Sequence, residues 1–547
     1  MQTMNARLFG IISSLFIVGG PFSCSAQPSA TSDPPNIVLI LADDMGYSDI
    51  GCFGAEIQTP HLDRLAAEGV RLSSFYNNAR CCPSRAALLT GRYPHQVGVG
   101  AMTDIGVSIP EYQGYFNEET VTLADVLRQA GYATYLSGKW HVGEEPSHWP
   151  LAHGFDHCFS LIQGAASYFD FQPYRNEHWP PGNALTVVRD STPVDRSDTS
   201  FYATDLYTDQ ALRMLSRHPG DQPFFLYLSY TAPHWPLHAL PEDIRKYKDT
   251  YQGGWEAIRQ KRYERLKSLD LISGQTPLSE KNPVERDWDT LSETEQQQEA
   301  RLMAVYAAMV DRLDQNIGQL LDYLETNSQL ENTVILFLSD NGGSTAGSLA
   351  GGKYGHSRFD ANAQPGTPTS FTGYGKRWAN VSNTPFRFFK TDTYEGGIAS
   401  PFIAWYPRRF KAGHITDAAT HIIDILPTLA QLAGTSYPDT LNGRAIPPVE
   451  GVSLLPALMG KDDLATRPLY FEHMGNCGLI EGEWKLVRFR DQDWQLYNRL
   501  EDRSETNNLA DAYPGRLQKM RRQYQRWAKQ NRVLPWEVVE QAIPYEF

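Results

Sequence analysis

The chain has 547 residues, with 49 Lys and Arg against 63 Asp and Glu, so its formal net charge is −14. A hydrophobic content of 41% and an aromatic content of 12% can bury a large core, which excludes disordered, collagen-like and low-complexity classes. The negative charge repels polyanions, so nucleic-acid binding is not expected, and an anionic substrate would need a local cationic pocket.

The N-terminus carries a predicted signal peptide, residues 1–26. Arg7 precedes an apolar run over residues 8–19, and small residues follow, with cleavage expected after Ala26. That run is too short for a membrane anchor, and no later stretch reaches the ~20 apolar residues of a membrane span. We therefore expect an exported chain, periplasmic or secreted, without stable membrane insertion. A lipoprotein anchored through Cys24 is the alternative, for which residues 21–23 are a poor signal.

Strand and helix patterns then alternate along the chain. Residues 37–41 are apolar on both faces, as in the centre of a parallel sheet, and two carboxylates follow them. A short helical pattern over residues 60–68 stops at Gly69. Helix and strand patterns recur in pairs at 122–132 and 133–141, 203–218 and 223–230, and 302–324 and 333–343. This order predicts a doubly wound, largely parallel α/β sheet flanked by helices.

Polar side chains follow four of these predicted strands. Because ligands bind beyond the carboxyl ends of the strands in such sheets, we expect the side chains to share one rim. They are Asp43 and Asp44, Lys139 and His141, His234, and Asp340 and Asn341.

The second half of the chain begins with a long segment rich in Gly, Ser and Thr, residues 342–378, which we interpret as a loop over the site. A strand over 399–407 and a helix over 420–434 follow. Beyond residue 462, short alternating strands and a polar helix ending near Asn531 predict a small antiparallel-sheet domain. The expected division is a leader over 1–26, a catalytic α/β domain over 36–462 and a C-terminal α+β subdomain over 463–547.

Five of the six cysteines remain after leader cleavage, too few for a disulfide scaffold in an exported protein. The adjacent pair Cys81 and Cys82 is compatible with a vicinal disulfide, a metal-binding pair or a buried coincidence, and its spacing does not distinguish these. Cys52 and Cys158 are interpreted as ordinary thiols.

The segment Cys-Cys-Pro-Ser-Arg, residues 81–85, is the motif that points most specifically to catalytic chemistry. A thiol before a helix start, with Pro83 in the first turn and Arg85 one turn further on, lies in a positively polarised place. A positively polarised environment of this kind suits a nucleophile that reacts with an anionic substrate group. The alternative is a buried thiol beside a chance arginine.

Several blocks together resemble the type I sulfatases of the alkaline phosphatase superfamily, and bacterial arylsulfatases most of all. They are CCPSRAALLTGR, LADDMGYSD, GKWHVG, TAPHWPL, LSDNGG and NTPFRFFKTDTYEGGI. The resemblance runs from about Asn36 to the end of the chain. It implies the sulfatase fold, with a large α/β sheet and a small C-terminal antiparallel sheet.

The resemblance makes Cys81 the precursor of Cα-formylglycine (3-oxoalanine), produced by a formylglycine-generating maturation enzyme, and Cys82 the variable position of the motif. The hydrated aldehyde would offer one hydroxyl as the nucleophile toward sulfur, and collapse of the other would later expel sulfate. An unmodified thiol cannot perform that release.

The resemblance also makes Asp43, Asp44, Asp340 and Asn341 the metal ligands. All four offer oxygen donors, which favours a hard cation such as Ca²⁺ over Zn²⁺. Taken singly, each residue is equally compatible with a turn or a helix cap.

The remaining site residues are cationic or imidazole side chains. By resemblance, Lys139 bridges the aldehyde hydrate and the sulfate, and His141 takes the proton that triggers sulfate release. His234 and Lys390 contact the sulfate oxygens and protonate or stabilise the leaving oxygen, and Arg85 holds the formylglycine hydroxyl. In each case the alternative is a surface cation or a hydrogen-bonded core histidine.

His473 and Asn476, in FEHMGNCG, are expected to reach the site from the C-terminal domain, with His473 binding substrate. The alternative is that His473 packs the domains together. Cys477 stands where related sulfatases often have a basic residue, and this departure concerns substrate recognition.

These observations predict an arylsulfatase-like sulfuric ester hydrolase with one Ca²⁺ per site and a small-molecule or carbohydrate sulfate ester as substrate. Its products would be inorganic sulfate and an alcohol or phenol. The alternatives are a sulfated-carbohydrate sulfatase, a phosphonate or phosphodiester monoesterase of the same superfamily, and a binding protein in which Cys81 is never converted.

Overall fold

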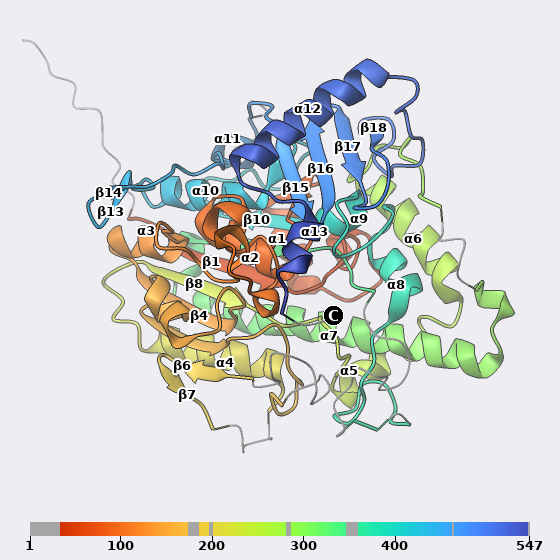
Figure 1. Cartoon of the computed structure of the whole chain (residues 1–547). Coiled ribbons are helices and arrows are strands. Elements are labelled where there is room, and N and C mark those ends of the chain that lie inside the picture. The colour runs from red at the N-terminus through yellow and green to blue at the C-terminus, as the bar shows by residue number, and fades with distance from the viewer. Residues whose placement is uncertain are drawn as a thin grey trace, which may run out of the picture. The chain divides into compact units, whose positions relative to one another are not determined.

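The computed structural model describes residues 33–172, 185–195, 201–280, 286–345, 359–360, 362–461 and 464–544. The predicted leader and Cys24 lie outside these residues, as does much of the predicted loop over the site. Residues 34–547 form one compact unit (Figure 1). Within the described ranges, no helix has both the length and the apolar character that a membrane span requires.

One ten-stranded sheet organises this unit, and its five central strands are parallel neighbours. Leu39 at the centre pairs with Leu336 on one side and Tyr227 on the other. The predicted largely parallel sheet is confirmed, with antiparallel strands outside the central five. In spatial order the strands are β11 (His414–Thr416), β2 (Val70–Leu72), β10 (Phe402–Trp405), β9 (Thr333–Ser339), β1 (Asn36–Ala42), β8 (Phe224–Ser229), β4 (Ala133–Lys139), β5 (His157–Leu161), β6 (Val187–Arg189) and β7 (Thr192–Pro193).

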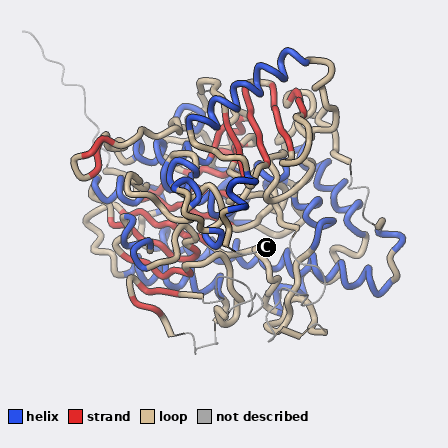
Figure 2. The backbone as a smooth tube through the Cα atoms, in the orientation of Figure 1, coloured by secondary structure: helices blue, strands red, loops and turns tan. Residues whose placement is uncertain are grey.

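Helices cover both faces of the sheet, which makes it doubly wound (Figure 2). Successive side chains of a strand point to opposite faces, so Leu39 and Leu41 pack into one hydrophobic cluster while Val38 and Ile40 pack into another. The first cluster includes residues of α2 (Cys81–Thr90), α3 (Leu123–Gln129) and α10 (Ile425–Leu432). The second includes residues of α1 (Pro60–Glu68), α4 (Ala203–Ser216) and α7 (Glu293–Thr326).

Two of these helices differ in length from the sequence prediction. The helix predicted over 420–434 is shorter, because Thr420 and His421 pair with β3 (Phe75–Tyr76) and a 3₁₀ turn follows them. The helix predicted over 302–324 is longer and begins at Glu293, since Ser292 and Glu295 form a reciprocal capping box before it.

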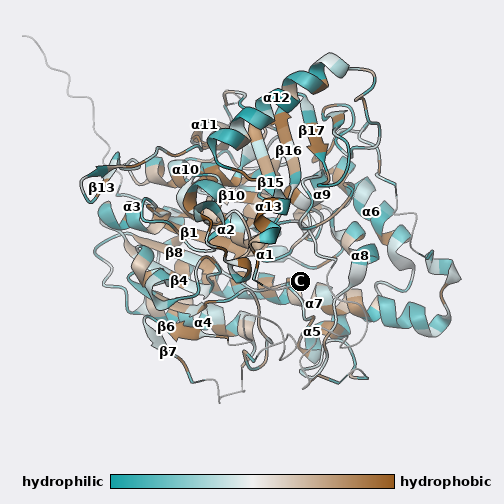
Figure 3. Ribbon diagram, viewed as in Figure 1, coloured by the Kyte–Doolittle hydropathy of each residue, from teal (hydrophilic) through white to brown (hydrophobic). Residues whose placement is uncertain are grey.

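The C-terminal residues form a separate four-stranded antiparallel sheet, as predicted. Its strands are β15 (Leu469–His473), β16 (Asn476–Glu481), β17 (Trp484–Arg488) and β18 (Gln495–Asn498). The helix α12 (Pro514–Gln530) packs on β16 and β17. Figure 3 shows this helix as mostly hydrophilic and β16 beneath it as mostly hydrophobic, which is the pattern of a surface helix covering a sheet. The helix α13 (Trp536–Gln541) follows.

The remaining elements are short or lie at the edges. They are α5 (Pro241–Lys246), α6 (Gly254–Ser268), α8 (Gly375–Ser382), α9 (Glu395–Ile398), α11 (Leu455–Leu458), β12 (Thr420–His421), β13 (Thr440–Leu441) and β14 (Arg444–Ala445).

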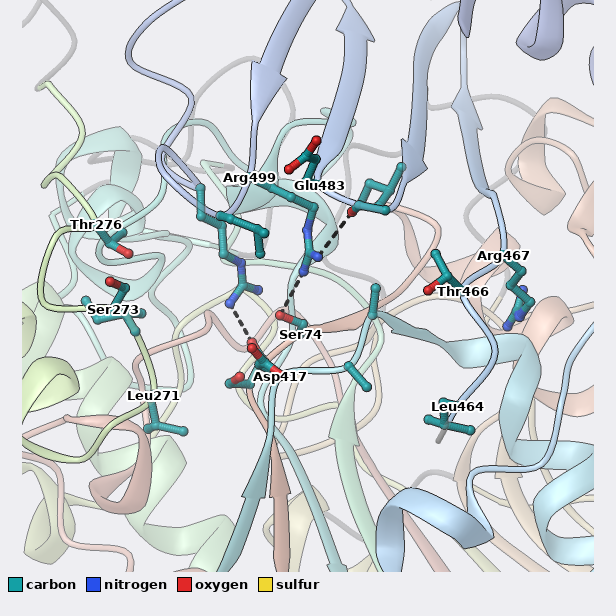
Figure 4. Close-up of a pocket in the computed structure, with 18 of the residues that line it drawn as sticks. Ser74, Leu271, Ser273, Thr276, Asp417, Leu464, Thr466, Arg467, Glu483 and Arg499 are labelled. Atoms are coloured by element: carbon teal, nitrogen blue, oxygen red, sulfur yellow. Dashed lines mark hydrogen bonds between the residues drawn. The ribbon is translucent and has the colours of Figure 1, made fainter. Parts of the chain in front are cut away.

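A cavity of about 300 Å³ lies between the C-terminal sheet and segments that follow β2 and the edge strand β11 (Figure 4). Arg499 donates to Ser74 Oγ at 3.0 Å across it, and Arg503 donates to the Ser73 carbonyl at 2.7 Å. None of the predicted site residues lines this cavity.

Candidate active site

Four parallel strands deliver the predicted polar residues to one edge of the central sheet. Asp43 and Asp44 follow β1, Asp340 and Asn341 follow β9, Lys139 ends β4 with His141 two residues on, and His234 follows β8. Asp44 and His141 have positive φ angles of 66° and 61°. Non-glycine residues adopt this conformation uncommonly, and here it turns the chain sharply where each strand ends.

Cys81 is the first residue of α2, and its side chain is buried. A hydrogen bond with the Cys82 thiol and the charges of Lys139 and Lys390 outweigh burial, and they lower its pKa well below the usual range. A helix N-terminus and nearby cations both favour a thiolate. Cys82 differs, since burial raises the pKa of its thiol well above the usual value. Both cysteines are free thiols, not a vicinal disulfide.

Arg85 lies one turn further along α2 and is fully buried. Its Nε and Nη2 atoms lie 2.9 and 2.8 Å from Asp340 Oδ2, and its Nη1 donates to the Lys139 carbonyl at 3.1 Å. Nη1 also donates to Ser229 Oγ at 2.5 Å. Arg85 therefore ties α2 to the ends of three strands and fixes the Asp340 carboxylate.

Asp43 and Asp44 each face a lysine. Lys139 Nζ lies 2.7 Å from Asp43 Oδ2, and Lys390 Nζ lies 2.5 Å from Asp44 Oδ1. Burial alone would raise the pKa of Asp44, but the charges of Lys390 and His234 lower it to about 2. For Asp43 burial prevails over the Lys139 charge, and the pKa is raised.

We use the name aspartate site for the group formed by Asp43, Asp44, Asp340 and Asn341. Three of its oxygens, Asp43 Oδ1, Asp44 Oδ2 and Asn341 Oδ1, are buried and have no hydrogen-bond partner. Such an acceptor costs roughly 1–3 kcal/mol if nothing fills its place. Converging carboxylate and amide oxygens are the ligands of a hard cation, so the residues present fit Ca²⁺.

Two histidines border the aspartate site, and both are neutral near pH 7. Burial and the Lys139 charge lower the pKa of His141 to about 4, and burial with Lys390 lowers that of His234 to about 3. His234 Nδ1 lies 2.5 Å from the Trp235 carbonyl, which directs Nε2 toward Asp44 Oδ2 at 3.5 Å. A neutral imidazole can accept a proton, which suits general acid and base chemistry.

The C-terminal sheet contributes His473, the last residue of β15. This side chain is fully buried, and neither ring nitrogen has a hydrogen-bond partner. Burial lowers its pKa well below the usual range, with Arg80, Cys81 and Lys390 among the charges that act on it. The structure thus brings His473 to the side of the site where Cys81 lies.

Asn476 takes a different position from His473. Its Nδ2 donates to the Thr391 carbonyl at 3.1 Å, next to Lys390 in the chain, and its Oδ1 accepts from the Arg490 amide at 3.1 Å. Thr391 has a φ of 84°, which is strained for a β-branched residue. Asn476 therefore supports the turn that carries Lys390.

The structure also places two serines here that the sequence analysis did not identify. Ser229 ends β8 and binds Arg85, while Ser339 ends β9 and accepts the Met45 amide at 3.1 Å. Their position at the ends of strands that lead into the site was the available signal.

Two family models match the chain. The model described as Sulfatase matches residues 35–435, and that of the C-terminal part of N-sulphoglucosamine sulphohydrolase matches residues 386–530. An uncharacterised sulfatase of Schizosaccharomyces pombe is 35% identical over 517 residues, which are 90% of this chain and 93% of that protein. An arylsulfatase of Klebsiella aerogenes is 34% identical over 465 residues, 82% of this chain and 96% of that protein.

A likeness extends to solved structures. Ps i-CgsB in complex with k-i-k-neocarrahexaose matches with a TM-score of 0.67 at 26% identity, over 91% of this chain and 94% of that one. The resemblance indicated by the sequence blocks is confirmed by these comparisons.

Proposed function

This chain belongs to the sulfatase family, and from that premise we propose that it hydrolyses an organic sulfate ester with formylglycine at position 81 and one Ca²⁺ at the aspartate site. The family and the named relatives make it a sulfatase enzyme. The finer steps below are our proposal.

One observation carries the proposal. Cys81, at the start of α2, shares a buried space with two lysines, two neutral histidines and three carboxylate or amide oxygens that lack partners. In a chain with a net charge of −14, this is the local cationic pocket that an anionic ester requires.

Each residue then has a defined part. After conversion to formylglycine, position 81 would supply a hydrated aldehyde, in which one hydroxyl attacks sulfur and the other allows sulfate to be released. A bound Ca²⁺ would polarise the sulfate oxygens. Lys139 and Lys390 hold the sulfate oxygens, and His473 adds a contact from the C-terminal sheet.

The two histidines and the arginine complete the assignment. His141 is neutral and takes the proton that must leave when sulfate is expelled, and His234 stabilises the leaving oxygen. Arg85 holds the formylglycine hydroxyl in the expected assignment, and its hydrogen bonds also support a positioning role, because they orient Asp340.

The substrate class is a small aryl sulfate or a sulfated carbohydrate. The arylsulfatase relative supports the first, and the neocarrahexaose bound in Ps i-CgsB supports the second. We further propose export through the leader over 1–26, maturation by a formylglycine-generating enzyme, and a division into parts over 36–462 and 463–547.

Two measurements on one preparation test the proposal. Protein produced in a host with a maturation enzyme is digested, and the peptide that carries Cys81 is analysed by mass spectrometry for the aldehyde or its hydrate. The same preparation is assayed with 4-nitrophenyl sulfate, 4-nitrophenyl phosphate and a phosphonate monoester. The expected result is an aldehyde at position 81 and turnover that favours the sulfate.

Other results would point elsewhere. Turnover that favours the phosphate or phosphonate ester would identify a monoesterase of the same superfamily. A persistent thiol at Cys81, with no turnover, would favour the binding protein.

A further inference from the structure

A cleft of about 700 Å³ lies against the C-terminal sheet and is lined by residues of β16, β17, α12 and the segment leading into α13. Three acidic side chains line it, but five cationic ones outnumber them although the whole chain is strongly negative. The cationic residues are Arg488, Arg490, Arg521, Lys529 and Arg532.

Three of these cations have no acidic partner. Arg532 pairs with Glu111 at 3.2 Å. Arg490 pairs with three carboxylates, those of Glu540 at 3.2 Å, Asp491 at 3.5 Å and Glu537 at 3.8 Å. Within the described ranges, no carboxylate lies within the 4.0 Å of an ion pair from Arg488, Arg521 or Lys529. Among the described residues, these three cations are therefore the part of the cleft's positive charge that no ion pair neutralises.

Arg488 is also held in place. Its guanidinium lies over the Trp494 ring, 4.9 Å from the centroid. A cation fixed by an aromatic ring is preorganised for an anion. Arg521 and Lys529 lie on the exposed side of α12 and remain free to reach a ligand.

The cleft and the active site share one hairpin. Glu472, Gly475 and Cys477 line the cleft, while His473 between them faces Cys81 and Lys390. The alternation of side chains along β15 explains this, because Glu472 and His473 point to opposite faces of the sheet. Two residues span at most about 7 Å, so Gly475 in the cleft wall lies close to His473.

We propose that this cleft binds a second anionic group, a sulfate or a carboxylate, on the saccharide whose scissile sulfate lies at Cys81. The inference rests on the proposed function and narrows its substrate to a multiply charged saccharide. Cations without a carboxylate partner among the described residues, beside a hairpin that also carries His473 of the active site, fit a ligand long enough to cross that hairpin. A single small aryl sulfate does not reach the cleft.

The test removes two charges from α12 in two matched ways. Arg521 and Lys529 line the cleft, whereas Arg522 and Arg526 are exposed on the same helix and do not. The cleft variant is R521Q with K529Q, and the control variant is R522Q with R526Q. Both lower the net charge equally, so a general electrostatic effect would move both by the same factor.

The probes are a carrageenan hexasaccharide, which carries only sulfates, and a glycosaminoglycan hexasaccharide, which carries sulfates and carboxylates. The affinity of each probe is measured in two ways. One is its inhibition of 4-nitrophenyl sulfate hydrolysis, and the other is titration calorimetry on proteins that also carry the substitution C81A. Since an exposed ion pair changes affinity by roughly twofold to fivefold, loss of two contacts should weaken binding of the preferred probe about tenfold.

The outcomes separate cleanly. A loss confined to the cleft variant supports the proposal, and the probe that is affected identifies a sulfate or a carboxylate as the group bound. Three results would overturn it: an equal loss of affinity in both variants, no loss of affinity in either variant, or no binding of either probe to the protein with an intact cleft. Hydrolysis of 4-nitrophenyl sulfate stays unchanged in both variants. If neither 4-nitrophenyl sulfate nor either saccharide probe releases inorganic sulfate while calorimetry still shows cleft binding, the proposed function fails and the cleft does not.

Discussion

Two buried groups of charges start from the same loop after β1 and differ in whether their atoms are paired. The aspartate site begins at Asp43 and Asp44. The second group, which we name the Arg262 cluster, consists of Arg262, Asp49, Glu56, Tyr251 and Tyr306. Asp43 and Asp49 are only six positions apart, and neither is exposed to solvent.

The Arg262 cluster pairs its charged atoms completely. Arg262 Nη1 donates to Asp49 Oδ1 at 2.6 Å, and its Nε and Nη2 donate to Glu56 at 2.9 and 2.7 Å. Tyr306 donates to Asp49 Oδ2 at 2.6 Å, and Tyr251 donates to Glu56 Oε1 at 2.8 Å. The aspartate site, in contrast, leaves three oxygens unpaired.

This contrast separates residues that hold the fold from residues that await a ligand. A folded chain pairs nearly all of its buried polar atoms, because each unpaired one is costly. A paired cluster therefore stabilises the fold as it stands. In the function proposed above, the unpaired oxygens of the aspartate site are the ones that a bound cation would satisfy.

The largest expected effect comes from the substitution Asp43→Asn. It keeps the shape of the side chain but removes a charged ligand from the aspartate site. Because a metal contributes several kcal/mol of charge stabilisation, kcat/KM for 4-nitrophenyl sulfate should fall by about 10³-fold or more. Bound calcium, measured by elemental mass spectrometry, should fall as well. The free energy of unfolding in chelator is measured alongside, because the substitution also breaks the buried ion pair with Lys139.

The matched control is the same substitution six residues later, Asp49→Asn. It should lower the free energy of unfolding but leave calcium content and activity per folded molecule intact. Equal calcium loss in the two variants would break the comparison, since it would mean that both groups support the metal.

The next effect is on stability alone and comes from Arg262→Met. Removal of the guanidinium leaves the buried carboxylate of Asp49 and the partly exposed carboxylate of Glu56 without their cation. Loss of one partner from a buried pair typically costs about 3–5 kcal/mol. Urea unfolding measures this loss. Lys261→Met, on the exposed face of the same helix, should change the free energy of unfolding by less than about 0.5 kcal/mol. If Arg262→Met left the free energy of unfolding unchanged, the Arg262 cluster would not contribute to the stability of the fold.

The sequence anticipated the aspartate site better than the Arg262 cluster. Asp43 and Asp340 each follow a strongly apolar strand and Lys139 ends a third, so parallel topology alone brings them to one edge. Arg262 lies on α6, far from Asp49 in sequence, and no local pattern links the two. Pairing of that kind depends on tertiary packing.

The same reasoning explains which parts of the C-terminal region could be predicted. Alternating residues identified its strands, and FEHMGNCG drew attention to His473 and Asn476. The direction of each side chain was not accessible, because a hairpin turn at Met474 and Gly475 determines which residue faces Cys81 and which supports Thr391. The unpaired cations beside this hairpin likewise become visible only when α12 is folded over the sheet.

A smaller effect on the aspartate site is expected from Asn476→Ala. The Thr391 carbonyl would lose its donor, and the strained turn that carries Lys390 would relax away from Asp44. One lost hydrogen bond of about 1 kcal/mol corresponds to a fivefold to tenfold fall in kcat/KM. Separate kcat and KM values and the melting temperature should be measured.

Asn508→Ala is the matched control for Asn476→Ala. Asn508 accepts the Leu496 amide at 3.1 Å in the same sheet but has no contact with the Lys390 turn. Both substitutions should lower the melting temperature slightly, and only Asn476→Ala should lower activity. If Asn508→Ala reduced kcat/KM as much, general loosening of the C-terminal sheet would explain both, and no positioning role would remain for Asn476.

The smallest expected effect is a pH dependence of the Arg262 cluster. Burial alone would raise the pKa of Glu56, but the Arg262 charge outweighs it and lowers the pKa below its ordinary value of 4.5. A lowered pKa means that the unfolded chain binds the proton more tightly. The stabilisation is therefore complete above about pH 4.5 and is lost as the pH falls toward the lowered value.

The substitution Glu56→Gln removes this titration. The side chain of Glu56 is 22% exposed, so the stabilisation from its charge should be about 1 kcal/mol rather than the value of a fully buried pair. We expect the variant to be less stable than the parent at pH 7, and we expect the difference to become smaller as the pH falls from 7 toward 3, as measured by urea unfolding at each pH. Because the substitution leaves the aspartate site intact, activity at pH 7 should be retained. A stability difference that stays constant from pH 7 to pH 3 would show that Glu56 contributes through packing and neutral hydrogen bonds, and the charge interaction that stabilises the Arg262 cluster would then be the one between Arg262 and Asp49.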